Sequence, residues 1–288
     1  MKSRMAASLA AIVLVLAACS SSATPMPTTA PATATPTSMA TATAASATTT
    51  TAPVNLTIYG AASLKAALAK AQTAYSAANP GATLTISTDS STALETKIEQ
   101  GAPVDVFLSA DTANPQKLVD KGLAAGSVTK FAGNLLTVIV PTANPAGIKT
   151  PADIAKSGVK VIAAGDTVPI TKYANQLVAN LAKQPGYPAD FVSEYTANIV
   201  SKQDNVAAVV AQIELGEGDA GIVYVTDAKT STKVATIAVP AAANVPATYS
   251  GVVVKASANP AAAQAFLAWF AGPDGQAILA SFGFLPAP

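Results

Sequence analysis

The sequence L-T-I-Y-G-A-A-S-L-K-A-A-L, residues 56–68, predicts an apolar strand that runs into an amphipathic helix through Ser63. A similar junction recurs at 84–98, L-T-I-S-T-D-S-S-T-A-L-E-T-K-I, where the helix opens at Ser90 and Ser91. A serine at a helix start presents a hydroxyl beside unpaired backbone N–H groups and the positive end of the helix dipole. Two such junctions make a good place to hold an anion without a cation. The ordinary alternative is N-capping, which most serines at helix starts perform.

Apolar, β-branched runs alternate with helical patterns along the rest of the chain, which predicts an α/β fold with a largely parallel sheet covered by helices. Strands are predicted at 56–61, 83–88, 104–109, 135–140, 160–164, 221–225, 234–239 and 249–254. Helices are predicted at 64–78, 92–100, 173–183, 206–215, 261–270 and 274–281. Gly101 and Gly216 stand where helix C-caps belong.

The N-terminal residues 1–19 have the pattern of a bacterial secretion signal. Lys2 and Arg4 form a positive region, and the apolar run at 5–16 is too short to span a bilayer. The sequence L-A-A-C that ends at Cys19 resembles a lipobox, in which the cysteine is lipidated and becomes the mature N-terminus. The alternative is an ordinary signal peptide that happens to end near a cysteine. Cys19 is the only cysteine, so an intramolecular disulfide is excluded.

Residues 20–53 consist only of Ser, Ala, Thr, Pro and Met. Such a segment cannot bury enough apolar surface to offset the entropy lost on ordering, so we expect a disordered tether. The tether would hold the domain that begins at Val54 away from a membrane surface, on the outer face of the cytoplasmic membrane.

Charge and residue usage exclude several classes of function. The chain has 17 basic and 16 acidic residues and no basic run, which argues against a nucleic-acid partner. Histidine is absent, which removes histidine acid–base chemistry and Cys/His zinc sites. The reactive groups that remain are carboxylates, serines, lysines and tyrosines, and neither a directly ligated metal nor a cofactor is expected.

Two familiar motifs are rejected because of their context. The glycines of G-E-G-D-A-G at 216–221 follow a helix and precede a strand, the reverse of a dinucleotide-binding turn. The S-x-x-K pattern at 157–160 leads into a strand and lacks the elements that accompany it in β-lactamases.

Five segments in order resemble the molybdate-binding proteins of ABC transporters. They are A-A-S-L at 61–64, S-S-T-A-L at 90–94, G-A-P-V-D-V-F-L-S-A-D at 101–111, V-P-I-T-K-Y-A at 168–174, and the stretch from N-V to G-I-V-Y-V-T-D-A at 205–228. The resemblance extends from Val54 to the C-terminal F-G-F-L-P. It implies a periplasmic-binding-protein type II fold with two crossing segments, in which the first lobe comprises 54–135 plus 243–288 and the second 136–242.

The family resemblance implies a tetrahedral oxyanion that is held only by hydrogen-bond donors. Ser63 and Ser91 would donate from the first lobe; Ile170 and Val206 would give backbone N–H groups from the second, and Tyr224 its phenol. Ile170 and Val206 have the alternative of simple packing residues, and Tyr224 that of a core tyrosine bonded to a carbonyl. The implied protein is a monomeric, extracytoplasmic, non-enzymatic lipoprotein that delivers molybdate, and also tungstate, to a membrane permease.

The sequence departs from the family pattern at two places, which keep other functions open. Asp89 stands where the family has a small neutral residue; strand alternation favours an outward side chain, whereas a carboxylate facing the cleft would favour phosphate. Thr171 and Lys172 replace a glycine, and Lys172 would add a positive charge at a helix start. The alternatives are a binding protein for phosphate or sulfate and, less favoured, a surface hydrolase that uses Ser63 or Ser91.

Overall fold

The structure is a computed structural model that describes residues 53–288. The predicted signal segment, Cys19 and all of the predicted tether except Pro53 lie outside the described residues. Within the described part, no helix is both long enough and apolar enough to span a bilayer.

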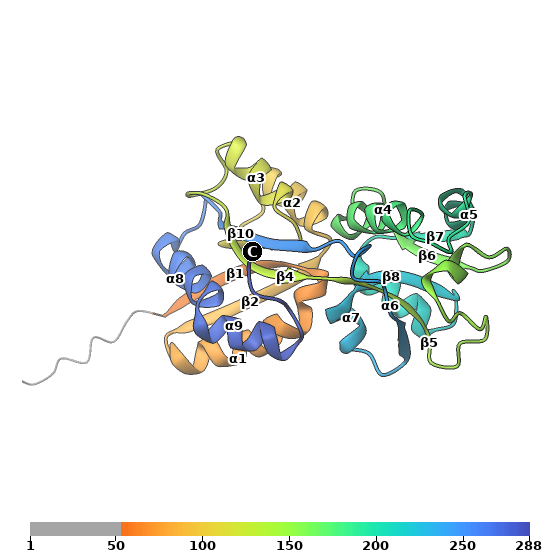
Figure 1. The fold of residues 1–288 in the computed structure, drawn as a ribbon. Helices are drawn as coiled ribbons and strands as arrows, with labels where there is room; N and C mark the ends of the chain where they lie inside the picture. Colours follow the sequence, from red (N-terminus) through yellow and green to blue (C-terminus); the bar gives the residue numbers. More distant parts are fainter. Residues whose placement is uncertain (1–52) are drawn as a thin grey trace, which may run out of the picture. The chain divides into compact units, whose positions relative to one another are not determined.

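The first of two five-stranded sheets has the strand order β2-β1-β3-β10-β4. Its strands are β1 (Val54–Ala61), β2 (Ala82–Asp89), β3 (Val106–Ser109), β4 (Thr129–Asn134) and β10 (Ala247–Val253). Strand β1 pairs in parallel with β2 and β3, whereas β10 runs antiparallel to β3 and β4. The helices associated with this sheet are η1 (Ala62–Leu64), α1 (Lys65–Ala78), α2 (Ser91–Glu99), α3 (Ala113–Asp120), α8 (Pro260–Ala271) and α9 (Pro273–Ser281). Figure 1 shows the five α-helices of this set around the sheet.

The second sheet has the order β7-β6-β8-β5-β9. Its strands are β5 (Leu136–Pro141), β6 (Val161–Ala164), β7 (Ile199–Gln203), β8 (Ala220–Tyr224) and β9 (Val234–Ile237). Strand β6 is parallel to β7 and β8, and β5 is antiparallel to β8 and β9. The associated helices are η2 (Pro151–Ala155), α4 (Pro169–Leu181), α5 (Phe191–Ala197), α6 (Val206–Glu214) and α7 (Val225–Lys229).

Two crossing segments join the sheets. Strand β4 ends at Asn134 and β5 begins at Leu136, so a single residue separates strands of different sheets. The second crossing segment runs from β9 to β10, and its Asn244 side chain accepts a hydrogen bond from the Leu136 N–H (3.0 Å) and donates one to the Leu136 carbonyl (2.8 Å). These reciprocal bonds tie the two crossing segments to each other.

The predicted α/β class with two crossing segments is confirmed, but three details of the sequence interpretation are wrong. The sheets are mixed rather than largely parallel, because β5 and β10 enter each sheet from the crossing segments and run antiparallel to their neighbours. Strands β4 and β7 are absent from the predicted elements. Helix α4 begins at Pro169 rather than at residue 173, since proline is well suited to the first helical turn.

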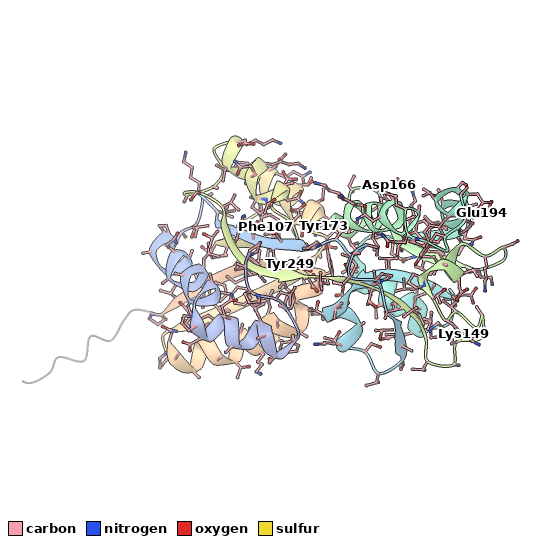
Figure 2. The ribbon with its side chains drawn as sticks, in the orientation of Figure 1. Phe107, Lys149, Asp166, Tyr173, Glu194 and Tyr249 are labelled. Carbon is pink, nitrogen blue, oxygen red and sulfur yellow. The ribbon has the colours of Figure 1, made fainter. Side chains whose placement is uncertain are left out.

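The core of each sheet is built from apolar side chains that are almost fully buried. Figure 2 shows Phe107 and Tyr249, which lie on β3 and β10 of the first sheet and are both 0% exposed. Tyr249 contacts the aromatic rings of Phe131 and Phe284, with centroid distances of 6.3 and 5.3 Å. Beside it, Gly251 allows a close approach of β10, since a Cβ there would lie 2.7 Å from the Phe107 carbonyl oxygen.

Substitution Gly251→Ala is expected to lower the free energy of unfolding by about 1–3 kcal/mol, because the added methyl group meets a backbone atom that cannot rotate away. Chemical denaturation followed by circular dichroism measures this change. The matched control is Gly165→Ala, where the Cβ would meet no atom closer than 3.6 Å and where we expect a change within about 0.5 kcal/mol. Equal stability of the two variants would contradict the close approach at β10.

Candidate functional site

All five residues that the sequence nominates line one cavity in the structure. Ser63, Ser91, Ile170, Val206 and Tyr224 surround it. The remaining lining residues are Ala61, Ala62, Asp89, Ser90, Ala110, Val168, Pro169 and Asn205. The cavity has a volume of about 10 Å³, close to the minimum for one water molecule. Wider clefts of about 380 and 640 Å³ share lining residues with it.

The cavity lies where parallel strands of both sheets end. Strands β1 and β2 of the first sheet end at Ala61 and Asp89, and β8 of the second sheet ends at Tyr224. Open α/β sheets bind ligands outside the carboxyl ends of their strands. The backbone therefore brings the two serine junctions and the loops of the second sheet to a common place.

Neither serine acts as an ordinary N-cap. Ser63 lies within the short turn η1 rather than at the first residue of α1, and its hydroxyl oxygen is 2.8 Å from that of Tyr249. The Ser91 hydroxyl accepts a hydrogen bond from the Ala110 N–H (3.0 Å), and Ser90 at the N-cap of α2 makes no side-chain cap bond. The capping alternative is therefore wrong for these serines.

Three helices of at least nine residues begin at the cavity. Ser91 and Val206 are the first residues of α2 and α6, and Ile170 is the second residue of α4. The N–H groups of a first helical turn have no intrahelical acceptor. Helices α2 and α4 also have no side-chain cap bond, and the cap of α6 is used by Ala208 rather than by Val206.

Tyr224 places a buried hydroxyl without a partner at the cavity. The residue is 1% exposed, and its hydroxyl oxygen has no hydrogen-bond partner among the described residues. An unsatisfied buried hydroxyl costs about 1–3 kcal/mol. Burial, reinforced by the neighbouring Tyr249, raises the pKa of Tyr224 well above its usual value, so the phenol keeps its proton. The hydroxyl is thus a donor that stands ready for a ligand.

Asp89 borders the cavity, but its carboxylate is already occupied. One oxygen accepts from the Ser90 N–H (2.8 Å) and from the Asn205 side-chain amide (3.2 Å), and the other from Lys97 (3.1 Å). Burial opposes ionisation, but these donors together hold the pKa of Asp89 below its usual value. Two hydrogen bonds connect the two halves of the site. Asn205, after β7, donates to Asp89 at the end of β2, and the Thr92 hydroxyl in α2 donates to the Thr167 carbonyl after β6 (2.7 Å).

The suggestion that Lys172 contributes a charge at a helix start is wrong. The helix begins at Pro169, and Lys172 is exposed and absent from the cavity lining. The neighbouring Thr171 donates its hydroxyl to the carbonyls of Ala164 (3.1 Å) and Gly165 (2.7 Å), which fixes the turn in the absence of a glycine.

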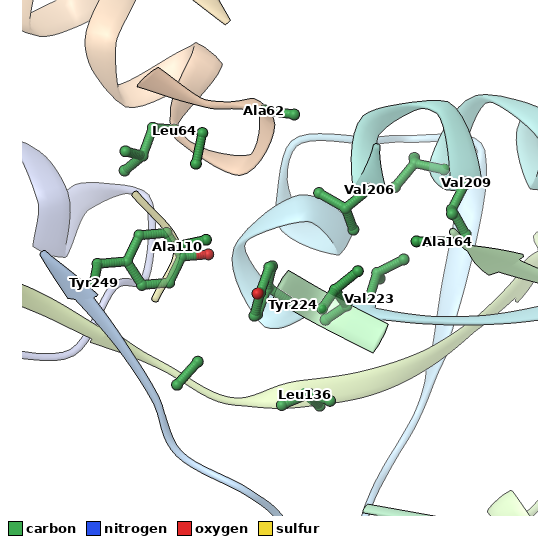
Figure 3. Close-up of a cluster of buried hydrophobic side chains, with 14 of the residues drawn as sticks. Ala62, Leu64, Ala110, Leu136, Ala164, Val206, Val209, Val223, Tyr224 and Tyr249 are labelled. Atoms are coloured by element: carbon green, nitrogen blue, oxygen red, sulfur yellow. The ribbon is translucent and has the colours of Figure 1, made fainter. Parts of the chain in front are cut away.

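Sequence reasoning missed Tyr249, whose hydroxyl contacts Ser63, and Asn205, which caps α6 and reaches Asp89. Figure 3 shows the Tyr249 hydroxyl directed to the side on which Tyr224 and Val206 lie. Asn205 directly precedes the 206–214 helix, so an N-cap signal could have identified it. Tyr249 follows from no local pattern, because it is 186 residues from Ser63 in the sequence.

The chemistry of the cavity is that of a donor site. Within residues 53–288, neither serine hydroxyl has a lysine or carboxylate as hydrogen-bond partner, as an activated nucleophile would require. In the same part of the chain, no group of three His, Cys, Asp or Glu side chains is arranged to hold a metal ion. Hydroxyls and first-turn amides from several helices suit an anion that offers only acceptors.

Two sheets joined by two crossing segments, with a donor-lined cavity at their strand ends, are the arrangement of a solute-binding protein. The chain belongs to the bacterial extracellular solute-binding protein family, whose model matches residues 56–285.

Among its relatives, the molybdate-binding protein ModA of Mycobacterium tuberculosis is 32% identical over 80% of this chain and 84% of its own length. A relative from Bacillus subtilis, 30% identical over 80% of this chain and 86% of its own length, carries the words ABC transporter substrate-binding lipoprotein in its name. The solved periplasmic molybdate-binding protein of Azotobacter vinelandii is 25% identical, with a TM-score of 0.68 over 81% of this chain and all of the other.

Asp227 helps to fix the backbone of Tyr224. Its carboxylate, in the first turn of α7, accepts a hydrogen bond from the Tyr224 N–H (3.1 Å). Burial raises the pKa of Asp227 to about 7, although the Tyr224 bond opposes this rise. A carboxyl with a raised pKa in the folded state stabilises the fold below its unfolded pKa, and this contribution is lost as the pH rises through about 7.

We expect the free energy of unfolding to contain a component from Asp227 that falls between pH 4 and pH 7, by at most about 4 kcal/mol. In Asp227→Asn this component is absent, so denaturation curves across that range give a flatter pH dependence than in the wild type. Identical pH profiles for the two proteins would contradict the assigned pKa.

Proposed function

We propose that this protein captures molybdate, and also tungstate, outside the cytoplasmic membrane and delivers it to an ABC transporter permease. The observation that carries the proposal is the buried, protonated and unpartnered Tyr224 hydroxyl beside the two serines. Ser63, Ser91 and Tyr224 would donate hydroxyl hydrogens, and Ile170 and Val206 their backbone N–H groups. The names of the relatives from Mycobacterium tuberculosis and Azotobacter vinelandii support molybdate as the ligand. No catalytic step is required of any of these groups.

The magnitudes are sufficient for tight binding. Each helix N-terminus acts as roughly half a positive charge, so the starts of α2, α4 and α6 offset most of a dianion's charge. Hydrogen bonds to a charged group contribute about 1.5–3 kcal/mol each. Five to seven of them, less the cost of association, give dissociation constants on the order of micromolar to nanomolar.

Ligand entry requires motion, because the cavity is close to the minimum for one water molecule whereas the ligand is a five-atom anion. We propose that the lobes at 54–135 plus 243–288 and at 136–242 move apart about the crossing segments and close again around the anion. Donors from both lobes contact the ligand together only in the closed form, which makes closure depend on the ligand. The Asn205–Asp89 and Thr92–Thr167 bonds are formed in the closed form.

Selectivity against phosphate follows from the difference in protonation between the candidate anions. Molybdate and tungstate present only acceptors at neutral pH, whereas hydrogen phosphate keeps a proton that needs an acceptor. Asp89 is the carboxylate at the cavity, and its oxygens already accept from Ser90, Lys97 and Asn205. An unpaired proton in the closed cavity costs about 1–3 kcal/mol, which disfavours phosphate. Sulfate lacks such a proton and must be distinguished by size.

We further propose that the protein is a monomeric lipoprotein anchored through Cys19 on the outer face of the membrane. The lipobox-like sequence and the lipoprotein name of the Bacillus subtilis relative support this anchor. Residues 20–53 would then act as the tether between the lipid and the binding domain. Labelling with a radioactive fatty acid tests the anchor: wild-type protein incorporates the label and Cys19→Ala does not, whereas label in both would place the lipid elsewhere.

Calorimetric titration of the domain from residue 54 with molybdate, tungstate, sulfate and phosphate tests the ligand. We expect molybdate and tungstate to bind with micromolar or lower dissociation constants and phosphate at least tenfold more weakly. Substitution Asp89→Ala should not weaken phosphate binding, since Asp89 is not its proton acceptor. The absence of molybdate binding at millimolar concentration, or a clear preference for phosphate, would overturn the proposal.

Substitution Tyr224→Phe separates a ligand-binding hydroxyl from a structural one. Affinity for molybdate should fall about 10- to 100-fold, because one charge-assisted bond is lost. The unliganded variant should be at least as stable as the wild type, since an unsatisfied buried hydroxyl is removed. Thermal unfolding with and without molybdate measures both effects. A less stable variant with unchanged affinity would show that the hydroxyl serves the core.

A further inference from the structure

We propose that Tyr249 is a positioning residue, which forces the Ser63 hydroxyl to donate its hydrogen into the cavity. Tyr249 does not line the cavity, but its hydroxyl oxygen lies 2.8 Å from that of Ser63. This inference rests on the proposed anion-binding function and adds a residue that controls the direction of one hydrogen bond in the site.

Asn134, at the end of β4, determines which of the Tyr249 and Ser63 hydroxyls donates to the other. Its side-chain oxygen accepts a hydrogen bond from the Leu135 N–H (3.0 Å), which identifies that atom as the oxygen. The amide nitrogen therefore faces the opposite side, where it donates to the Thr226 hydroxyl (2.8 Å) and, at a longer distance of 3.4 Å, to the Tyr249 hydroxyl. Asn134 is 1% exposed, so bulk solvent does not compete for these partners.

Tyr249 consequently has one acceptor for its own hydrogen. The side chain is 0% exposed, and its hydrogen-bond partners within the described residues are the Asn134 amide nitrogen and the Ser63 hydroxyl. An amide nitrogen cannot accept. Burial raises the pKa of Tyr249 well above its usual value, so the hydrogen stays on the phenol. Leaving it unpaired would carry the cost of an unsatisfied buried donor, so Tyr249 donates to Ser63.

The same count of donors and acceptors determines the direction in which the Ser63 hydroxyl donates its hydrogen. A hydroxyl has one hydrogen and two acceptor positions. Because the Ser63 oxygen accepts from Tyr249, its hydrogen is available for the cavity, which Ser63 lines. Ser91 has an equivalent arrangement, since its oxygen accepts from the Ala110 N–H. Both serines thus enter the cavity as donors, and a ligand that must itself donate to a serine is rejected.

We call the chain of hydrogen bonds from Asn134 through Tyr249 to Ser63 the relay. A double-mutant cycle that combines Tyr249→Phe and Ser63→Ala tests it, with dissociation constants for molybdate and phosphate measured by calorimetry. In the wild-type background, Tyr249→Phe should weaken molybdate binding about 3- to 10-fold and reduce the preference over phosphate, because the Ser63 hydroxyl becomes free to accept. In the Ser63→Ala background, the same substitution should change affinity less than about twofold, since the group it acts through is gone.

The matched control is Tyr75→Phe. Tyr75 is also a buried tyrosine of the first sheet's helices, but it packs on Phe266 and Trp269 and does not line the cavity. We expect its substitution to leave molybdate affinity within about twofold of the wild type. A neutron diffraction map of the wild type tests the relay without a substitution, by showing deuterium bonded to the Tyr249 oxygen and directed to Ser63.

Two results would overturn the relay alone: equal loss of affinity from Tyr249→Phe in both backgrounds, or deuterium bonded to Ser63 and directed to Tyr249. A wild-type protein that binds none of the four anions would instead overturn the proposed function, and the relay with it. The two failures are therefore distinguishable.

Discussion

The convergence of helix N-termini and hydroxyl donors on one small buried space is the constraint on which the rest of the structure depends. Parallel strands of the two sheets end at this space, and each is followed by a turn that starts a helix or exposes a polar group. Donors of the same polarity that face one another without an acceptor are costly to bury. The surrounding apolar cores and the tied crossing segments hold them in place.

Under the proposed function, the charge of the anion is offset without a basic side chain in the cavity lining. Among the residues that line it, Asp89 is the charged one, and it is neutralised by Lys97 and by donors on both sides of the cavity. A mobile lysine would attract any anion, whereas fixed amides and hydroxyls act only at defined positions. This arrangement favours selection by shape and proton content over simple electrostatic attraction.

Much of the fold and the two serines of the candidate site could be predicted from local sequence, whereas Ile170, Val206 and Tyr224 were implied only by the family resemblance. Ser63 and Ser91 lie at strand-to-helix junctions, and the pattern of alternating strands and helices places such junctions at one edge of a sheet. The residues that mark a helix start lie within a few positions of one another, so a short stretch of sequence is enough to recognise it. The α3, α5 and α7 helices were not predicted, because helices of five to eight residues give little periodicity.

The contacts that control the direction of hydrogen bonds could not be predicted in this way. Tyr249 meets Ser63 across 186 residues, and Asn134 meets Thr226 across 92, because the chain crosses between the sheets and returns. The outward orientation favoured for Asp89 from strand alternation does not describe its position either, since Asn205 draws its carboxylate to the cavity wall from 116 residues away. Such long-range pairs depend on the tertiary structure and have no counterpart in local patterns.

The most direct measurement of the central claim is an anomalous diffraction map, recorded at the molybdenum absorption edge, of crystals grown with molybdate. The account predicts one molybdenum peak in the cavity, with ligand oxygens within hydrogen-bond distance of the hydroxyls of Ser63, Ser91 and Tyr224 and of the N–H groups of Ile170 and Val206. A peak beside lysine side chains at the surface, with the cavity unchanged, would contradict it.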